Sequence, residues 1–350
     1  MNARMATSKL HSVVLIPGDG IGPEVARAVR VILEAAEAPV RFLEHQAGQA
    51  ALESGSDELL PSETVEAIRT HHVALKGPCT TPIGSGFRSV NVALRKTLNL
   101  YAAVRPVKSL PGVETRYTDV DLIIIRENTE GLYSGVENEI THDVVASMKV
   151  ATRSACHRIA LWAFRFATQR RRATLTVLHK ANIMKMTDGM FIEEARRVAE
   201  HDYPNIEYTE MIIDAAAMRL VQEPTSFDIL LCENLYGDIV SDLCSGFVGG
   251  LGVSPGANIG DDDAVFEAVH GSAPAIAGKG MANPLALLMS SVMMLQHLAE
   301  KRSDARCAQS ADRIHRAYEM ALSAGKKTRD LGGSLDTDAF TQAVVERLAG

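Results

Sequence analysis

Short apolar strands and amphipathic helices alternate along the chain, and this alternation constrains the fold more than any other feature of the sequence. Strands are predicted at residues 13–16, 40–44 and 73–76, with helices between them at 24–35 and 62–70. Such alternation is typical of α/β folds, in which helices cover the faces of a sheet. The alternation continues through helices at 89–99, 154–168 and 188–201 and strands at 122–125, 173–178 and 227–232.

The composition sets limits on size and partners. The chain has 350 residues, of which 46% are hydrophobic and 23% charged, with a formal net charge of -7. This length is enough for two domains with their own cores. Basic residues do not gather into a stripe, so nucleic acid is not expected as a partner. No apolar run reaches the length of a membrane span, and residues 1–12 lack the apolar core of a secretory signal.

Five cysteines are scattered along the chain without a C-x-x-C pair: Cys79, Cys156, Cys232, Cys244 and Cys307. Their odd number and irregular spacing argue against a disulfide framework and against a zinc site. We therefore expect a reducing compartment and predict a cytoplasmic protein.

The turn at residues 17–24 reads PGDGIGPE and lies between the first strand and the first helix. A dinucleotide-binding Rossmann fingerprint occupies the same place in its fold. Here the glycines give G-x-G-x-G instead of G-x-G-x-x-G. A tight strand-to-helix turn is enough to explain these glycines, so a Rossmann fold is not predicted.

Some later stretches are interpreted from composition rather than periodicity. Residues 249–260 are rich in glycine and are interpreted as a crossing between domains, and residues 267–283 as another loop of small residues. Residues 139–152 alternate loosely and are predicted to be strands outside the main sheet. The apolar helix predicted at 281–300 is expected in the core or in a subunit contact.

Asp238 and Asp242 are four residues apart on a helix predicted to begin at Tyr236, after the buried strand at 227–232. This spacing puts both carboxylates on one face, where their repulsion weakens an isolated helix by about 0.2–0.5 kcal/mol. A cation between them would remove that repulsion, and hard oxygen pairs suit Mg²⁺ or Mn²⁺. Two solvated aspartates on an exposed helix are the alternative interpretation.

Arg95, Arg105 and Arg126 lie beside apolar sequence in the first half of the chain, and Arg126 ends a predicted strand. Arginines at strand ends form bidentate contacts with carboxylates. Together they favour a polyanionic small-molecule substrate, although each alone fits a surface arginine. The loop at 77–86, dense in glycine, proline and hydroxyls, is a further functional candidate.

Lys180 and Asp214 each lie where a predicted strand runs out. Three carboxylates around a divalent cation leave positions for the hydroxyl and carboxylate oxygens of a substrate. A lysine or aspartate would take the hydroxyl proton, and a tyrosine would return a proton to carbon. This set fits a metal-dependent reaction on a hydroxy-polycarboxylate but does not by itself establish a hydride transfer, and Lys180 also fits an ordinary surface charge.

Several stretches together resemble the metal-dependent β-decarboxylating dehydrogenases of the isocitrate/isopropylmalate dehydrogenase family. They are residues 16–24, 89–95, 126–133, 179–185, 234–243 and 270–283. The resemblance implies an α/β, two-domain isopropylmalate-dehydrogenase-like fold with a mixed central sheet, which is not a Rossmann fold. It implies a large cofactor-binding domain from residues 1–100 and 249–350. The small domain, residues 101–248, is expected to carry the metal and substrate site and the dimer contacts, with a clasp near 134–152.

The resemblance assigns roles to matching positions. Tyr133 and Lys180 match the catalytic pair, with Tyr133 expected to protonate the enol left after CO₂ departs. The positions that match carboxylate-binding arginines are Arg95, Arg105 and Arg126, and those that match metal-binding aspartates are Asp214, Asp238 and Asp242. In the family, Lys180 and Asp214 reach the site from a second subunit, so a homodimer or higher homo-oligomer is implied.

The resemblance also implies a nicotinamide cofactor. Thr81 and Asn91 match positions near the nicotinamide, and the adenosine half is expected to contact His270, Gly271, Ser272, Ala273, Pro274, Ala275, Ile276, Asn283 and Asp330. NAD-dependent relatives usually carry an aspartate where this chain has Ala275, and NADP-dependent relatives often have lysine then tyrosine at positions 275 and 276. Ile276 matches the NAD type and neither residue is basic, so NAD is favoured over NADP.

Ser89 and Asn91 decide which substrate is expected. In isocitrate-specific members a serine and an asparagine at these positions contact the third carboxylate, whereas isopropylmalate enzymes have apolar residues there. Isocitrate is therefore favoured, with homoisocitrate, 3-isopropylmalate and tartrate as alternatives, and Ser89 also fits a simple helix N-cap. A regulatory subunit of a hetero-oligomeric enzyme is the alternative of a different class. It is expected to have lost part of the metal and acid–base set, which this chain retains.

Overall fold

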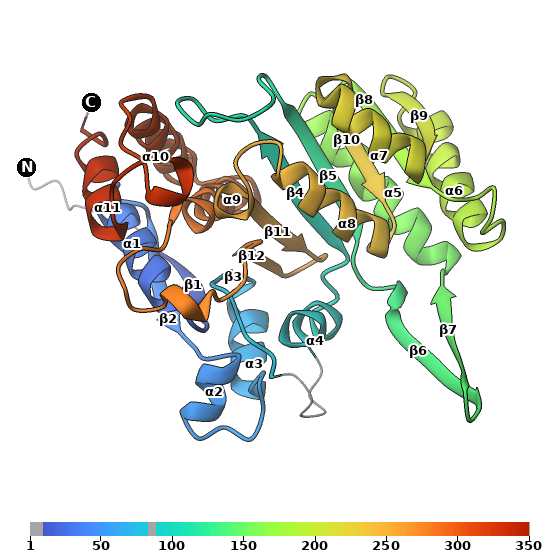
Figure 1. Ribbon diagram of the computed structural model, residues 1–350, viewed down its shortest axis with the longest axis horizontal. Helices are drawn as coiled ribbons and strands as arrows, with labels where there is room; N and C mark the ends of the chain where they lie inside the picture. Colours follow the sequence, from blue (N-terminus) through green and yellow to red (C-terminus); the bar gives the residue numbers. More distant parts are fainter. Residues whose placement is uncertain (1–9, 83–88, 350) are drawn as a thin grey trace, which may run out of the picture. The chain divides into compact units, whose positions relative to one another are not determined.

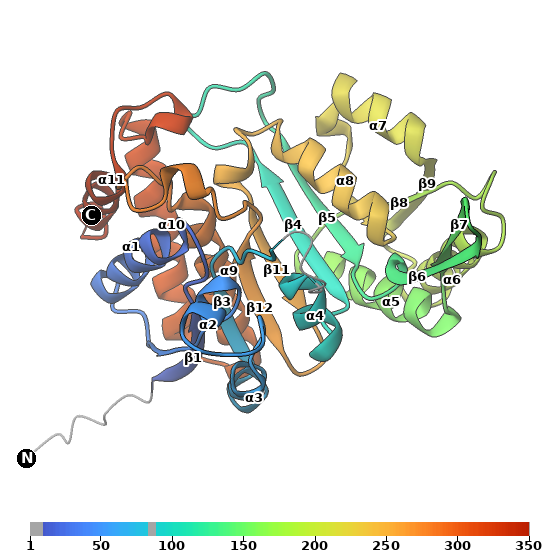
Figure 2. The ribbon, with the colours of Figure 1, turned by 60° about the horizontal axis from the view of Figure 1, so that its bottom comes forward.

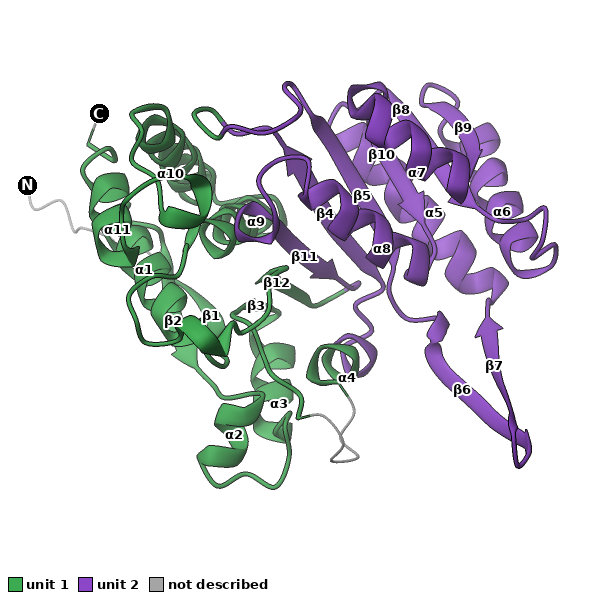
Figure 3. Cartoon of the chain, viewed as in Figure 1, with its two compact units in different colours: residues 1–94, 111–113, 262–350 green, residues 95–110, 114–261 purple. Residues whose placement is uncertain are grey.

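The chain folds into two compact units, and the computed structural model describes residues 10–82 and 89–349 (Figure 3). Unit 1 comprises residues 1–94, 111–113 and 262–350, and unit 2 comprises residues 95–110 and 114–261. The sequence predicts a boundary at 248/249, whereas the structure keeps residues 249–261 within unit 2. Among the described residues, no helix combines the length and the apolar character needed to cross a membrane.

The strands of unit 1 run parallel in the order β2 (Val40–Glu44), β1 (His11–Ile16), β3 (Val73–Lys76) and β12 (Ala264–Ala268). Every residue of β3 and β12 is buried, as expected for parallel strands covered on both faces. The helices of the unit are α1 (Gly22–Ala35), α2 (Gln49–Glu53), α3 (Ser62–His71), α9 (Leu285–Arg302), α10 (Ala305–Ser323) and α11 (Thr337–Val345). Helix α4 (Val90–Thr97) begins in unit 1 and ends in unit 2.

Unit 2 has a mixed arrangement of strands in the order β11 (Pro255–Ile259), β4 (Ala102–Lys108), β5 (Asp121–Glu127), β10 (Ile229–Cys232), β8 (Thr174–His179) and β9 (Glu207–Ile212). Neighbouring strands are antiparallel from β11 to β5 and parallel from β5 to β9. Helices α7 (Ile213–Gln222) and α8 (Asn234–Ser245) cover one face, and α5 (Arg153–Gln169) and α6 (Thr187–Asp202) cover the other (Figure 1). The predicted α/β fold with a mixed sheet is confirmed.

Strands β6 (Gly131–Thr141) and β7 (Val144–Val150) form a separate antiparallel ribbon, which we call the arm. In both Figure 1 and Figure 2 the arm lies apart from the main strands of unit 2. It corresponds to the strands predicted outside the main sheet, although it begins eight residues earlier than residue 139. Apolar side chains on it remain exposed, among them Ile140 at 65% and Val145 at 68%.

Some elements differ from the sequence-based expectation. The glycine-rich stretch interpreted as a crossing contains strand β11, and the stretch interpreted as a loop begins inside β12. Strand β4 was not predicted either. Glycine and proline disfavour strands locally, but pairing with neighbouring strands and burial decide such short segments. Helix α9 begins only after Pro284, four residues later than predicted, with the proline at the N-cap position.

A buried ion pair joins the adjacent strands β3 and β12. Lys76 and Glu267 are register partners, and the Lys76 ammonium lies 2.7 Å from the Glu267 carboxylate with both side chains at most 4% exposed. Lys76 also donates to the carbonyl of Gly77, 2.9 Å away. Charges this deep are tolerated only when paired, because each alone would lose its hydration without compensation.

We predict that Lys76→Met lowers the free energy of unfolding by about 3–5 kcal/mol, because the Glu267 carboxylate is left buried without its cation. The double variant Lys76→Met/Glu267→Leu should recover most of that loss, since no unpaired charge remains. Denaturant unfolding of the wild type, both single variants and the double variant measures the coupling. Strictly additive losses would show that the pair does not stabilise the two strands as a unit.

Candidate active site

Helix α8 presents two of the predicted metal-binding aspartates. It begins at Asn234, two residues earlier than predicted, because the Glu233 carboxylate caps it by accepting from the backbone N–H of Tyr236 at 3.1 Å. Asp238 and Asp242 lie one turn apart on this helix, as the spacing predicts. Burial, and then the charge of Asp238, raise the pKa of Asp242. The repulsion inferred from the sequence is therefore present in the structure.

Arg126 links strand β5 to α8 and is only 2% exposed. Its guanidinium donates from Nε and Nη2 to Asn234 Oδ1 at 2.9 and 2.7 Å, and from Nη1 to the Asp238 carboxylate. Gly237 permits this approach, because a Cβ there would lie 2.6 Å from the Arg126 side chain. Burial, and then the nearby Arg95, lower the pKa of Arg126. The site thus concentrates positive charge beside its carboxylates.

Arg105 lies on the same face of the sheet as Arg126. It is within strand β4, where it pairs with Ile124, two residues before Arg126 on β5, so the two side chains share a face. Arg105 is 5% exposed and its charge acts on Asp242. The three predicted carboxylate-binding arginines therefore come from helix α4 (Arg95), the middle of β4 (Arg105) and the end of β5 (Arg126).

Tyr133 joins the same cluster from the beginning of strand β6, at the base of the arm. Its hydroxyl donates to the Asp238 carboxylate, and the Arg126 guanidinium lies 5.1 Å from the centre of its ring. Burial, and then the hydrogen bond to Asp238, raise the pKa of Tyr133. A phenol with a raised pKa stays protonated, which suits a proton donor. We call Arg105, Arg126, Tyr133, Asp238 and Asp242 the α8 cluster.

Lys180 and Asp214 form a separate pair. Lys180 follows β8, Asp214 is in the first turn of α7, and their side chains form an ion pair that lowers the pKa of Asp214. Within the described part of the chain, the one group of three His, Cys or acidic ligand atoms lying within 4.8 Å of each other is His11, Asp304 and Cys307. A single chain therefore does not gather its three predicted metal aspartates.

The His11 group is an ion-paired helix cap rather than a second candidate metal centre. Asp304 caps α10, and Arg306 donates to both of its oxygens, at 3.0 Å from Nε and 2.6 Å from Nη2. His11 lies 2.9 Å from the same carboxylate. Both carboxylate oxygens are thus already used by a cation.

In unit 1, several predicted ligand-binding residues surround the start of α4. Thr81 Oγ1 accepts from the backbone N–H of Val90 at 3.1 Å, and the Ser89 carbonyl accepts from Ala93 at 2.8 Å. Asn91 Oδ1 is buried and has no hydrogen-bond partner in the described structure. A buried acceptor without a partner is costly, which is consistent with a ligand at this position. Residues 83–86 of the predicted functional loop lie outside the described residues.

The predicted adenosine loop follows β12. His270 Nδ1 lies 3.0 Å from the Gly271 carbonyl, while Nε2 is buried without a described partner, and burial lowers the pKa of His270. Ala273 has a left-handed backbone, with φ at 40°, before a 3-10 turn over Pro274–Ile276. Ala275 is exposed on that turn. The neutral imidazole therefore has a nitrogen available for a ligand.

Asn283 and Asp330 are brought together although they lie 47 positions apart in the sequence. The Asn283 amide donates to Asp330 Oδ2 at 2.9 Å, and its oxygen accepts from the backbone N–H of Leu285 at 3.0 Å. Thr328 Oγ1 holds the other Asp330 oxygen at 2.6 Å. Both predicted cofactor residues therefore have a structural role at the start of α9.

The PGDGIGPE turn is a junction between loops. The buried Asp19 carboxylate accepts backbone N–H groups from Gln49, Ala50 and Thr80, at 3.0, 2.7 and 2.5 Å. Ile21 donates to the Ser272 carbonyl at 2.9 Å, and Thr80 Oγ1 donates to Ser272 Oγ at 2.7 Å. A side chain at Gly20, which has φ at 61°, would collide with that Ser272 carbonyl. Gly20 therefore permits a close backbone contact between the turn and the loop that contains Ser272.

Sequence reasoning missed the residues that orient the cluster. Asn234 holds Arg126 and also donates to the Glu130 carbonyl at 2.8 Å, and Glu233 caps α8. Both lie in the matched stretch or beside it. The sequence feature that could have indicated these roles is the polar pair Glu233 and Asn234, which lies between a buried strand and a helix.

Comparison with known proteins identifies the family. The sequence profile of the isocitrate/isopropylmalate dehydrogenase family matches residues 12–348. The chain belongs to this family. Its fold is that of the solved isocitrate dehydrogenase from Methylococcus capsulatus, with a TM-score of 0.91 and 46% identity over 97% of this chain and 100% of that chain.

Two relatives that are equally similar to this chain have different substrates in their names. The mitochondrial NAD isocitrate dehydrogenase catalytic subunit 5 of Arabidopsis thaliana is 51% identical over 96% of this chain and 88% of its own length. The chloroplastic 3-isopropylmalate dehydrogenase of Solanum tuberosum is also 51% identical, over 92% of this chain and 88% of its own length. The chain is thus a decarboxylating dehydrogenase of this family, and overall similarity does not separate the two substrates.

We predict that Asp19→Asn lowers the free energy of unfolding by about 1–3 kcal/mol, because the new amide NH₂ cannot accept all three backbone N–H groups. The exposed Asp57→Asn is the matched control and should stay within about 0.5 kcal/mol of the wild type. Denaturant unfolding measures both. Equal effects of the two substitutions would show that the junction does not depend on the Asp19 carboxylate.

Proposed function

We propose that the protein catalyses the NAD-dependent oxidative decarboxylation of isocitrate to 2-oxoglutarate and CO₂. The observation that carries the proposal is the α8 cluster. It brings together two arginines that can bind substrate carboxylates, a tyrosine that stays protonated, and two aspartates that repel each other. The names of the relatives from Arabidopsis thaliana and Methylococcus capsulatus support it. The polar pair Ser89 and Asn91 favours the third carboxylate of isocitrate.

The donor set fits a divalent cation. Burial, and then the charge of Asp238, raise the pKa of Asp242, and a cation between the two carboxylates would relieve their repulsion. Mg²⁺ or Mn²⁺ would be held by these two aspartates together with Asp214 of the partner subunit. Bound there, the metal would polarise the hydroxyl oxygen of the substrate and stabilise the charge that develops on it.

The residues of this chain then divide the remaining work. Arg95, Arg105 and Arg126 hold the substrate carboxylates, and a buried guanidinium binds a carboxylate strongly because water competes poorly. Lys180 of the partner subunit, as a neutral amine, would take the hydroxyl proton, and a nicotinamide held by unit 1 would accept the hydride from the same carbon. After the β-carboxylate leaves as CO₂, Tyr133 returns a proton to carbon.

The cofactor proposal rests on the adenosine loop. His270 offers a bare Nε2, and neither Ala275 nor Ile276 provides a positive charge for a 2′-phosphate. NAD is therefore proposed over NADP. Without the aspartate usual at position 275, adenosine binding should be weaker than in relatives that have it. Unit 1 is accordingly proposed as the cofactor-binding domain.

We infer that the active form is a homodimer or higher homo-oligomer in which Lys180 and Asp214 complete the site of the partner subunit. Two observations support this. The pair lies outside the α8 cluster in its own chain, and apolar side chains on α7, α8 and the arm are exposed. They include Met218 at 59%, Ile239 at 59% and Val145 at 68%. Such exposure favours burial against a second copy.

A panel of substrates tests the reaction. Isocitrate, homoisocitrate, 3-isopropylmalate and tartrate are each supplied with NAD or NADP and with Mg²⁺ or Mn²⁺, and nicotinamide reduction is followed. We expect the largest kcat/KM for isocitrate with NAD. A larger value for 3-isopropylmalate would favour the function of the Solanum tuberosum relative instead. Purified protein that reduces neither cofactor with any acid would favour a regulatory subunit.

We predict that Asp238→Asn lowers kcat by about 100-fold or more, because residues that merely orient a metal ligand are already worth about 10- to 100-fold. The exposed loop variant Asp262→Asn is the control and should retain wild-type activity. Calorimetric titration with Mn²⁺ should show weakened binding for Asp238→Asn only. Unchanged affinity and activity in that variant would remove Asp238 from the site.

A further inference from the structure

Asp188 holds the backbone of Lys180. It lies in the first turn of α6, is 2% exposed, and its Oδ2 accepts the Lys180 backbone N–H at 2.8 Å. Lys180 is the first residue after β8, so this bond fixes the point at which the chain leaves the strand. The side chain of Lys180 then extends to Asp214.

Lys149 of the arm supplies the cation for Asp188. Its ammonium lies 2.5 Å from Asp188 Oδ1 and 3.6 Å from the carboxylate of Glu233, the residue that caps α8. The ammonium also sits 4.7 Å from the centre of the Tyr236 ring. The Lys149 side chain is 11% exposed, so its position is determined by these partners rather than by water.

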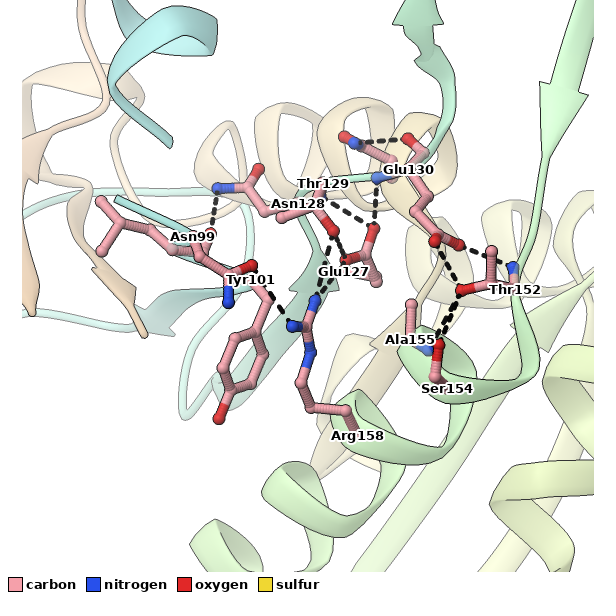
Figure 4. A network of polar contacts seen from close by, with 12 residues as sticks. Asn99, Tyr101, Glu127, Asn128, Thr129, Glu130, Thr152, Ser154, Ala155 and Arg158 are labelled. Carbon is pink, nitrogen blue, oxygen red and sulfur yellow. Dashed lines mark hydrogen bonds and ion pairs between the residues drawn. The ribbon is translucent and has the colours of Figure 1, made fainter. Parts of the chain in front are cut away.

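The base of the arm is fixed independently. Figure 4 shows the Glu130 carboxylate, next to the start of β6, bonded to Thr152, which follows the end of β7. The Thr152 backbone N–H and hydroxyl donate to Glu130 at 2.8 and 2.6 Å. Thr152 in turn caps α5. Both ends of the arm are therefore tied together, and Lys149 enters the core of unit 2 at a defined place.

The surroundings of the pair leave no room for a ligand. The cavity beside Lys149, Asp188 and Glu233 has a volume of about 20 Å³. That is space for roughly one water molecule. Among the described residues, Lys149 contacts Asp188, Glu233 and Tyr236, which orient Lys180 and α8.

We propose that Lys149 and Asp188 are positioning residues for Lys180, so that the placement of the arm sets the geometry of the catalytic lysine. Lys149 fixes the Asp188 carboxylate, and this carboxylate fixes the Lys180 backbone. The same ammonium reaches the Glu233 cap of α8. An arm displaced from its position thus releases Lys180. The catalytic part of this inference rests on the proposed function, whereas the structural part does not.

Amide hydrogen exchange of the wild-type protein tests the structural part without any substitution. The Lys180 N–H should exchange as slowly as the amides of β8, because it is bonded to a buried carboxylate. Exchange of Lys180 at the rate of an unprotected amide would overturn the proposal, whatever the substrate of the enzyme proves to be.

Substitution of Lys149 tests the coupling. Lys149→Met should speed exchange of the Lys180 amide by about tenfold and lower kcat by about tenfold, with KM for the hydroxy acid within about threefold of the wild type. Lys149→Arg keeps the charge and its donors and should restore both values to within about threefold. Lys108→Met, at the exposed end of β4, is the control and should change neither.

The outcomes distinguish the positioning role of Lys149 from the proposed function. A folded Lys149→Met variant with unchanged Lys180 exchange and unchanged kcat overturns the positioning role. Equal losses in Lys149→Met and Lys149→Arg show that the arm needs lysine for packing alone, which also overturns it. If Lys149→Met does not fold, the wild-type exchange and the Lys149→Arg variant decide. If no hydroxy acid is oxidised, the proposed function fails, and the exchange measurements still decide the structural part.

Discussion

The buried guanidinium of Arg126 is the interaction on which the α8 cluster depends. A charged group that is 2% exposed needs partners for its donors, and Asn234 and Asp238 on α8 accept from its Nε, Nη2 and Nη1 atoms. The same contact fixes the distance of α8 from β5, and Gly237 is required because a side chain there would occupy the space of Arg126. Tyr133, on a different element, reaches the cluster through Asp238. The charge of Arg126, the placement of α8 and the position of the proposed proton donor Tyr133 are thus linked through Asp238.

Buried carboxylates that accept backbone N–H groups recur wherever a loop must be held. Asp19 joins the PGDGIGPE turn to α2 and to Thr80, and Asp188 holds Lys180. Glu24 accepts from Gly280 and Ala282, at 3.3 and 2.9 Å, near the start of α9. A carboxylate has room for several donors, so one side chain fixes segments that are distant in sequence. Loops that carry functional residues gain a defined shape in this way without regular secondary structure.

Prediction from the sequence succeeded where a pattern is local and failed where strands depend on their neighbours. The alternation of strand and helix gave most elements of both units, and the i, i+4 spacing gave the shared face of Asp238 and Asp242. Strands β4, β11 and β12 were missed because proline, glycine and short length hide a strand whose stability comes from pairing. The wrong interpretation of residues 249–260 as a crossing has the same cause.

By itself, the sequence determined the family, the residues of the candidate site and the absence of a Rossmann fingerprint, because these depend on residue identity and spacing. Only the tertiary structure decided that Arg126 is held by Asn234, that Lys180 pairs with Asp214 away from the α8 cluster, and that Lys149 reaches Asp188 from the arm. These contacts join residues that lie 34 to 108 positions apart. No local periodicity encodes such pairings. They follow from how strands and helices pack. A buried charge must be paired or hydrogen-bonded, and its partner is the group that the fold places nearby.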